Sequence, residues 1–85
     1  MATHCYHAGG HDFEVDVFAI DTESDPPVAI YAARVTELGD GHRTPVQGKH
    51  QRAREVYGPT EEWAFRNVCA LLDRGDWCEV PQRQH

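Results

Sequence analysis

The sequence predicts a small α+β domain, in which a curved antiparallel sheet of about three strands, in the order β-β-β-α, carries one helix packed across one face. Three observations support this prediction. Apolar and acidic side chains alternate over residues 13–17, β-branched and aromatic residues are concentrated over 28–38, and apolar side chains recur at three- and four-residue spacing over 59–74. The first two patterns are typical of strands, and the third is typical of an amphipathic helix. Because the chain has 85 residues, we expect one domain with a small core.

The strands are expected to follow one another with turns between them. The first strand covers residues 13–20, and residues 21–27 form a loop because they collect turn formers and two prolines. The second strand covers residues 28–38, and the glycines of residues 39–41 predict a hairpin turn because they accept a positive φ. Residues 42–57 contain few apolar side chains, so we expect an edge hairpin or one irregular strand there.

The helix is expected over residues 59–74, because residues typical of helix termini mark both ends. Pro59 suits the first turn, two glutamates meet the positive end of the helix dipole, and Gly75 follows as a C-cap. Trp77, just past the helix, is expected to fold back onto its packing. The stripe expected to pack on the sheet consists of Ala64, Phe65, Val68, Cys69, Leu71 and Leu72.

The first residues of the chain are expected to lie outside the domain. Residues 1–12 are rich in histidine and glycine and show no apolar period, so we expect a flexible arm before a single domain that covers residues 13–85.

The composition predicts a cytoplasmic protein that does not act at a membrane. No run of apolar residues approaches the roughly 20 needed to span a bilayer, and the first residues do not resemble a secretory signal. The three cysteines cannot all pair within one chain, so free thiols and a reducing compartment are expected.

Charge is distributed unevenly along the chain, whose net charge is −6. Residues 1–40 hold eight carboxylates against Arg34 alone, and such a surface attracts cationic partners and repels phosphates. We therefore expect a protein–protein interaction module whose acidic sheet face binds a basic surface on another protein. The residues expected to contact this partner are Glu14, Asp16, Asp21, Glu23 and Asp25.

Two other binding functions stand as alternatives. The basic stretch of the sequence contains Arg43, Lys49, Arg52 and Arg54, and on a hairpin these charges would follow a nucleic-acid backbone. The same charges would also protect an edge strand from aggregation. Metal binding is the third interpretation, because ligands that suit zinc, copper or nickel lie close together in the sequence, namely His4, Cys5, His7 and His11.

Catalysis and cofactor binding are not expected. The sequence has no glycine-rich phosphate loop, no nucleophile elbow and no histidine–glutamate metalloprotease helix. The carboxylates of Glu14 and Asp16 fit the wet face of a strand rather than an acid–base pair. We therefore predict a non-enzymatic protein with no cofactor.

Two segments resemble a known family. Residues 31–38, which read YAARVTEL, and residues 58–68, which read GPTEEWAFRNV, resemble the strand and the helix start of HicB-like antitoxin domains. The resemblance implies a β-β-β-α arrangement with one helix across a curved sheet. It also favours protein–protein recognition, so an antitoxin-like role is expected.

Overall fold

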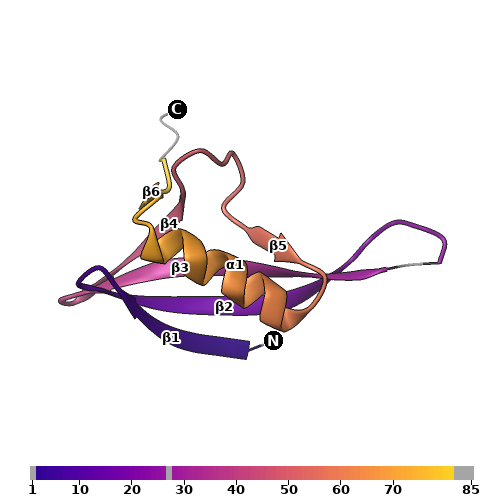
Figure 1. Cartoon of the computed structure of the whole chain (residues 1–85), viewed down its shortest axis with the longest axis horizontal. Helices are drawn as coiled ribbons and strands as arrows, with labels where there is room; N and C mark the ends of the chain where they lie inside the picture. The colour runs from indigo at the N-terminus through magenta and orange to yellow at the C-terminus, as the bar shows by residue number, and fades with distance from the viewer. Residues whose placement is uncertain (1, 27, 82–85) are drawn as a thin grey trace.

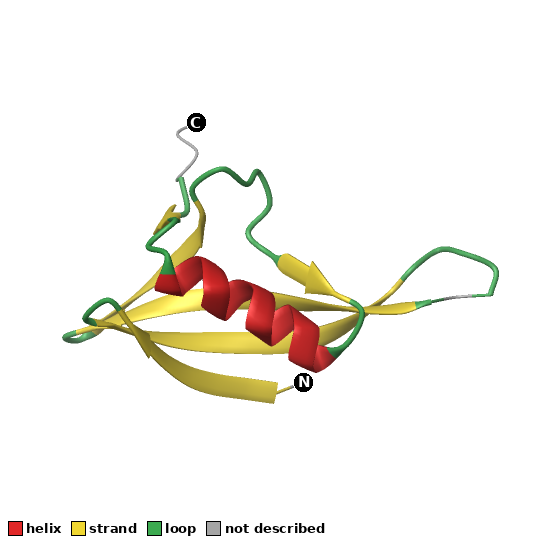
Figure 2. Cartoon of the chain, viewed as in Figure 1, coloured by secondary structure: helices red, strands yellow, loops and turns green. Residues whose placement is uncertain are grey.

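One helix covers one face of a six-stranded antiparallel sheet (Figure 1, Figure 2). The structure is a computed structural model that describes residues 2–26 and 28–81. The strands lie in the order β1-β2-β3-β4-β6, and β5 pairs with β3 outside this path. In chain order the elements are β1 (Ala2–Ala8), β2 (His11–Asp21), β3 (Ala29–Gly39), β4 (His42–Gly48), β5 (Val56–Gly58), α1 (Glu61–Asp73) and β6 (Trp77–Glu79).

The expected α+β class is confirmed, but the expected sheet of about three strands is wrong, because the sheet has six. The strands predicted over 13–20 and 28–38 correspond to β2 and β3, and the predicted hairpin turn joins β3 to β4. Residues 42–57 contain two strands, β4 and β5, which both pair with β3. The sequence did not predict β1 or β6. β5 and β6 have only three residues each, which is too short for a periodic pattern to be visible.

Most of the segment expected to form a flexible arm, 1–12, belongs to the sheet, since residues 2–8 form β1 and residues 11–12 begin β2. β1 pairs with β2 along its whole length, and Gly9 and Gly10 join the two strands. Their φ angles of 58° and 81° fit a two-residue hairpin turn that residues with a Cβ rarely adopt. The glycines therefore close a hairpin. The histidines of β1 obscure its period-two pattern, which is why the sequence did not predict this strand.

β4 and β5 share one edge of β3 (Figure 1). β4 pairs with residues 35–39 and β5 pairs with residues 31–33, so the two strands separate between these points. Arg54 lies in this gap. Its Nη2 donates to the carbonyl oxygen of Val35 at 3.3 Å and to Oγ1 of Thr36 at 3.3 Å. The side chain therefore ties the loop between β4 and β5 back to β3.

The helix α1 begins close to the predicted position within 59–74. Thr60 is its N-cap, and the Thr60 Oγ1 accepts a hydrogen bond from the backbone nitrogen of Trp63 at 3.1 Å. Pro59 therefore precedes the helix instead of lying in its first turn. The N-cap fixes the point at which the chain leaves β5 and enters the helix.

The far end of α1 is closed by Gly75, as predicted. Gly75 has a φ of 72°, and the backbone nitrogen of Asp76 donates to the carbonyl oxygen of Leu71 at 3.2 Å. The chain then turns back into β6. The ring of Trp77 packs edge-to-face on Phe13, with 5.1 Å between the ring centroids. The prediction that Trp77 folds back onto the core is confirmed.

The core lies between α1 and the helix-facing side chains of the sheet. The sheet contributes Phe13, Val15, Val17, Ala33, Val35 and Val46, all buried. The helix contributes the predicted stripe, of which Ala64, Val68, Cys69, Leu71 and Leu72 are buried and Phe65 is partly buried. The predicted helix face is therefore confirmed.

The short strand β5 is held closely against the helix. A Cβ on Gly58 would lie 2.6 Å from the backbone nitrogen of Ala64, so no larger residue fits without a shift of the backbone. The Asn67 Nδ2 donates to the carbonyl oxygen of Tyr57 at 3.1 Å. These contacts join β5 to α1 and to β3 at once.

We predict that Leu72→Ala lowers the free energy of unfolding by about 2–5 kcal/mol, because Leu72 is 2% exposed and its truncation leaves a cavity between helix and sheet. Denaturant melts provide the measurement. Arg66→Ala, at an exposed position of the same helix, serves as the control and should cost less than about 1 kcal/mol. Equal effects of the two substitutions would contradict the assigned core.

Candidate functional site

The pleat of the sheet divides the predicted site residues between two faces. We call the face away from α1 the open face. Phe13, Val15 and Val17 of β2 point toward the helix and are buried, so the alternating Glu14 and Asp16 point to the open face. Pairing partners in adjacent strands share a face, and this rule places the remaining side chains of the sheet.

The structure does not bring the predicted metal ligands together. By their register with β2, His4 lies on the helix side, whereas Cys5 and His7 lie on the open face. The His4 ring packs on Phe65, with 4.7 Å between the centroids. The ring nitrogen of His11 contacts a carboxylate oxygen of Glu37. Within residues 2–26 and 28–81, no group of three or more His, Cys, Asp or Glu side chains has an arrangement that could hold a metal ion.

The predicted acidic residues fall into two separate groups. Glu14 and Asp16 lie on the open face and already have partners there. A carboxylate oxygen of Glu14 accepts a hydrogen bond from Arg43, and Asp16 accepts one from the hydroxyl of Thr3 at 2.8 Å. Their charges are therefore partly compensated within the sheet. The other three residues, Asp21, Glu23 and Asp25, lie at the far end of β2 and in the loop that follows.

The predicted basic residues are also dispersed. The Arg43 guanidinium lies beside Glu14, and this hydrogen bond raises the pKa of Arg43. Arg54 is partly buried in the gap between β4 and β5. Lys49 and Arg52 are exposed in the loop between these strands. The four residues therefore do not form one continuous basic surface.

The ends of β2 and β3 project beyond the rest of the molecule (Figure 1, Figure 2). β1 reaches β2 only as far as Val17, and β5 reaches β3 only as far as Tyr31. The pairs Phe18↔Ala32 and Ala19↔Tyr31 still have β5 beside them, and beyond them the two strands pair with each other alone, at Ile20↔Ile30 and Asp21↔Ala29. We call residues 20–30 the ribbon. A two-stranded segment of this kind gains little stability by itself.

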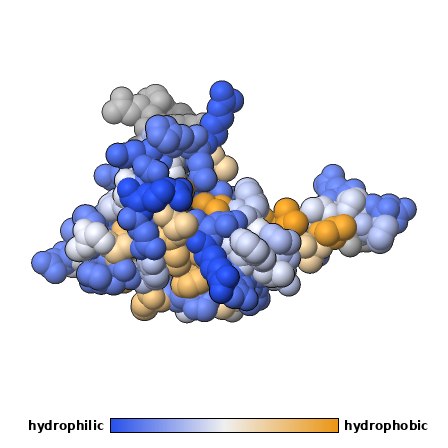
Figure 3. Space-filling model, viewed as in Figure 1, coloured by the Kyte–Doolittle hydropathy of each residue, from blue (hydrophilic) through white to orange (hydrophobic). Residues whose placement is uncertain are grey.

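The ribbon combines an apolar stem with an acidic tip. Val28 is 54% exposed, and Ile20 and Ile30 are directly opposite each other and only partly buried. Figure 3 shows hydrophobic surface where the ribbon leaves the body and hydrophilic surface at its end. The tip carries Asp21, Glu23 and Asp25, all exposed, and none of the ion pairs found among the described residues involves them.

The base of the ribbon on the open face contains aromatic and arginine side chains. Phe18 and Tyr57 lie on either side of Ala32 in the register, and Tyr57 is 46% exposed. The Arg34 guanidinium lies 5.0 Å from the centroid of the Phe18 ring and 3.4 Å from a carboxylate oxygen of Glu55. Aromatic residues and arginine are enriched in protein interfaces. The ribbon and its base therefore have the composition of a protein-binding surface.

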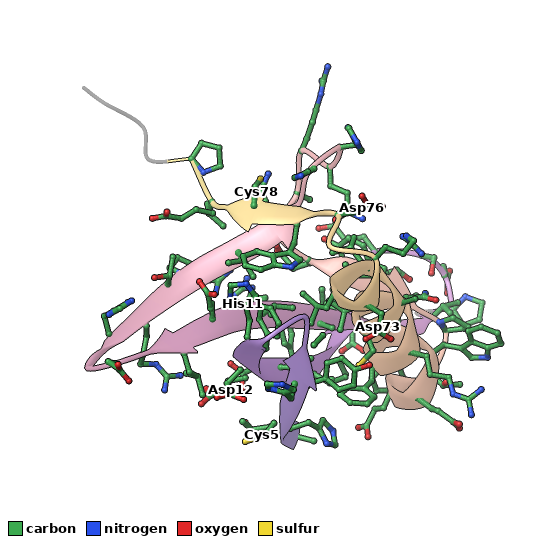
Figure 4. The ribbon with its side chains drawn as sticks, turned by 60° about the vertical axis from the view of Figure 1, so that its left-hand side comes forward. Cys5, His11, Asp12, Asp73, Asp76 and Cys78 are labelled. Carbon is green, nitrogen blue, oxygen red and sulfur yellow. The ribbon has the colours of Figure 1, made fainter. Side chains whose placement is uncertain are left out.

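A hollow of about 320 Å³ lies at the C-terminal end of α1, between the helix and the turn that joins β1 to β2 (Figure 4). His11, Asp73 and Trp77 line it. The Tyr6 hydroxyl donates to both carboxylate oxygens of Asp73, at 2.7 and 2.8 Å, which joins β1 to the helix. This hydrogen bond raises the pKa of Tyr6 to about 12. Burial, with a smaller contribution from Asp73, raises the pKa of the Cys69 thiol to about 11.

Comparisons with known proteins give no relative for this chain, since no family model, no curated protein and no solved structure matches it. No helix in the described part of the chain is long and apolar enough to cross a membrane.

The sequence predicted the acidic residues of the tip but not the ribbon that carries them. The available signal was the loss of alternation at both strand ends, in Phe18-Ala19-Ile20 and in Val28-Ala29-Ile30, where apolar residues point to both faces. In a sheet that a helix covers on one face only, the other face stays in water. The pattern therefore marked exposed apolar surface.

We predict that one of the three tyrosines titrates near pH 12, because the bond to Asp73 disfavours the Tyr6 phenolate. Since the folded-state pKa lies above the ordinary value of about 10, the stability from this bond is complete below about pH 10 and is lost toward pH 12. Ultraviolet absorbance of the phenolate provides the measurement. Tyr6→Phe should remove the late transition and Tyr57→Phe should keep it, whereas the opposite result would show that β1 does not dock on α1.

Proposed function

We propose that the protein is a non-enzymatic protein-binding module and that the ribbon is its recognition element. The observation that carries the proposal is the combination of exposed apolar side chains and three exposed carboxylates on a two-stranded projection. We place this interaction in the cytoplasm, in line with the three free cysteines, Cys5, Cys69 and Cys78.

The apolar stem supplies the contacts that stabilise a complex. Ile20, Val28 and Ile30 expose apolar surface to water without supporting the core, because they lie outside the buried cluster under α1. Burial of apolar surface contributes about 25 cal/mol per Å². A complex in which a partner covers these side chains gains this free energy, whereas the free protein exposes the same side chains to water.

The acidic tip selects the charge of the partner. Three carboxylates at one end of the molecule create a negative potential that attracts a basic surface and speeds its association at low salt. The expected partner therefore remains a basic protein, but the proposed contact lies at the tip of the ribbon instead of on the open face. Asp21, Glu23 and Asp25 carry it, whereas Glu14 and Asp16 are engaged with side chains of the same sheet.

The resemblance to HicB-like antitoxin domains points to the same kind of function and stays a prediction. If it holds, the partner that the ribbon recognises would be a toxin protein. Nucleic-acid binding receives less support, because Arg43 and Arg54 are engaged within the fold and only Lys49 and Arg52 are exposed in the loop between β4 and β5.

Two variants test the ribbon, each with a measurable effect. Ile20→Ser with Ile30→Ser removes the apolar stem and should weaken partner binding about tenfold or more, since central apolar anchors dominate interface energies. Asp21→Asn, Glu23→Gln and Asp25→Asn together remove the charge of the tip and should mainly slow association. The partner is captured from native lysate with the intact protein, and each binding constant is then measured with the purified partner.

The matched control removes three exposed carboxylates elsewhere: Asp40→Asn, Glu61→Gln and Glu79→Gln. It changes the net charge by the same amount as the tip variant and should leave both affinity and association rate nearly unchanged. Binding that responds equally to the control and to the tip variant would show a general charge effect. Binding that neither ribbon variant changes would contradict the proposal.

A further inference from the structure

The outer edge of β1 is open. β1 pairs with β2 on one side, and no described strand pairs with it on the other (Figure 1). Alternate residues of an edge strand direct their backbone N–H and C=O groups outward, where another strand can pair with them. Among residues 2–26 and 28–81, β1 therefore offers a row of backbone donors and acceptors that no strand pairs with, along seven residues.

The other outer strands in the described part of the chain are short or blocked. β5 and β6 have three residues each, and Asn67 occupies the outward carbonyl of Tyr57 in β5. β4 contains Pro45, and the backbone nitrogen of Val80 already donates to the Pro45 carbonyl oxygen at 3.0 Å. β1, in contrast, contains no proline, glycine, lysine, arginine, aspartate or glutamate. It lacks the features by which edge strands usually avoid pairing.

The sequence of β1 is complementary to itself when two copies run antiparallel. A two-fold axis at Cys5 places Ala2 opposite the partner's Ala8, Thr3 opposite the partner's His7, and His4 opposite the partner's Tyr6. This register uses all seven residues and keeps both helices on the same side of the joined sheet.

The side-chain pairs of this register fit in size and chemistry. On the helix side, His4 and Tyr6 already pack on Phe65, at 4.7 and 6.1 Å between ring centroids, so the two copies would join these aromatic clusters. On the open face, the Thr3 hydroxyl meets the partner's His7 and no carboxylate meets another. Small alanines lie at both ends of the paired segment.

We propose that this protein forms a two-fold symmetric homodimer in which β1 pairs antiparallel with β1 of a second copy, centred on Cys5. The dimer joins two sheets into one continuous sheet and presents two ribbons. The formation of this dimer does not depend on which partner the ribbons bind.

The mass of the reduced protein in solution tests the dimer. Light scattering after size exclusion should give twice the monomer mass. Cys5→Lys should give the monomer, because two lysines would face each other at the axis, whereas within one chain Lys would lie opposite Glu14. Cys5→Ser should remain dimeric. A monomeric wild type at the concentrations used for NMR, or a dimer that Cys5→Lys leaves intact, would overturn the proposal.

Disulfide formation tests the position of the axis. Directly opposite residues of antiparallel strands have Cα atoms about 4.5–5.5 Å apart, which lies within the range that a disulfide spans. In a Cys78→Ser background, diamide should accept two electrons and two protons from the two Cys5 thiols and link the copies covalently. Cys5 and Cys78 lie at opposite edges of the sheet (Figure 4), so Cys5→Ser, which retains Cys78, is the control and should not be linked. Linkage in the control only would overturn the assigned interface.

Discussion

The packing of α1 on the helix-facing side chains of β2 is the interaction on which the rest of the structure depends. Phe13, Val15 and Val17 are fully buried under the helix, and β2 pairs with both β1 and β3. A helix of 13 residues is about 20 Å long, whereas the longest axis of the molecule is 44 Å. One helix therefore cannot cover the whole sheet. The ribbon lies beyond its reach, and the outer edge of β1 has no strand beside it in the described part of the chain; the two proposals concern these two places.

The elements that bury apolar side chains were predictable from the sequence. The alternation over 13–17 identified β2, the apolar spacing identified α1 and its buried face, and Gly75 marked the end of the helix. β1 was missed because its helix-facing side chains include His4 and Tyr6, which pack on Phe65 but do not form an apolar pattern. The glycines at positions 9 and 10 suggest a flexible arm when taken with the histidines around them, although two consecutive glycines also favour a tight hairpin.

The candidate site was only partly predictable, because neighbours in sequence are not neighbours on a sheet. Glu14 and Arg43 were assigned to different surfaces, yet pairing of β2 and β4 with β3 brings them together on the open face. The proposed metal ligands alternate between two faces for the same geometric reason. Asp21, Glu23 and Asp25 stay together because Asp21 ends β2 and the other two follow within the next four residues of the chain.

The helix-covered part of the sheet forms the stable unit, and the ribbon projects from it without support. Native-state amide hydrogen exchange tests this claim most directly, since it reports the free energy of opening along the chain. Amides of residues 13–17 and of the buried face of α1 should exchange only on global unfolding, whereas amides of residues 20–25 and 28–30 should exchange far faster. Equal protection of the ribbon and of residues 13–17 would contradict the account.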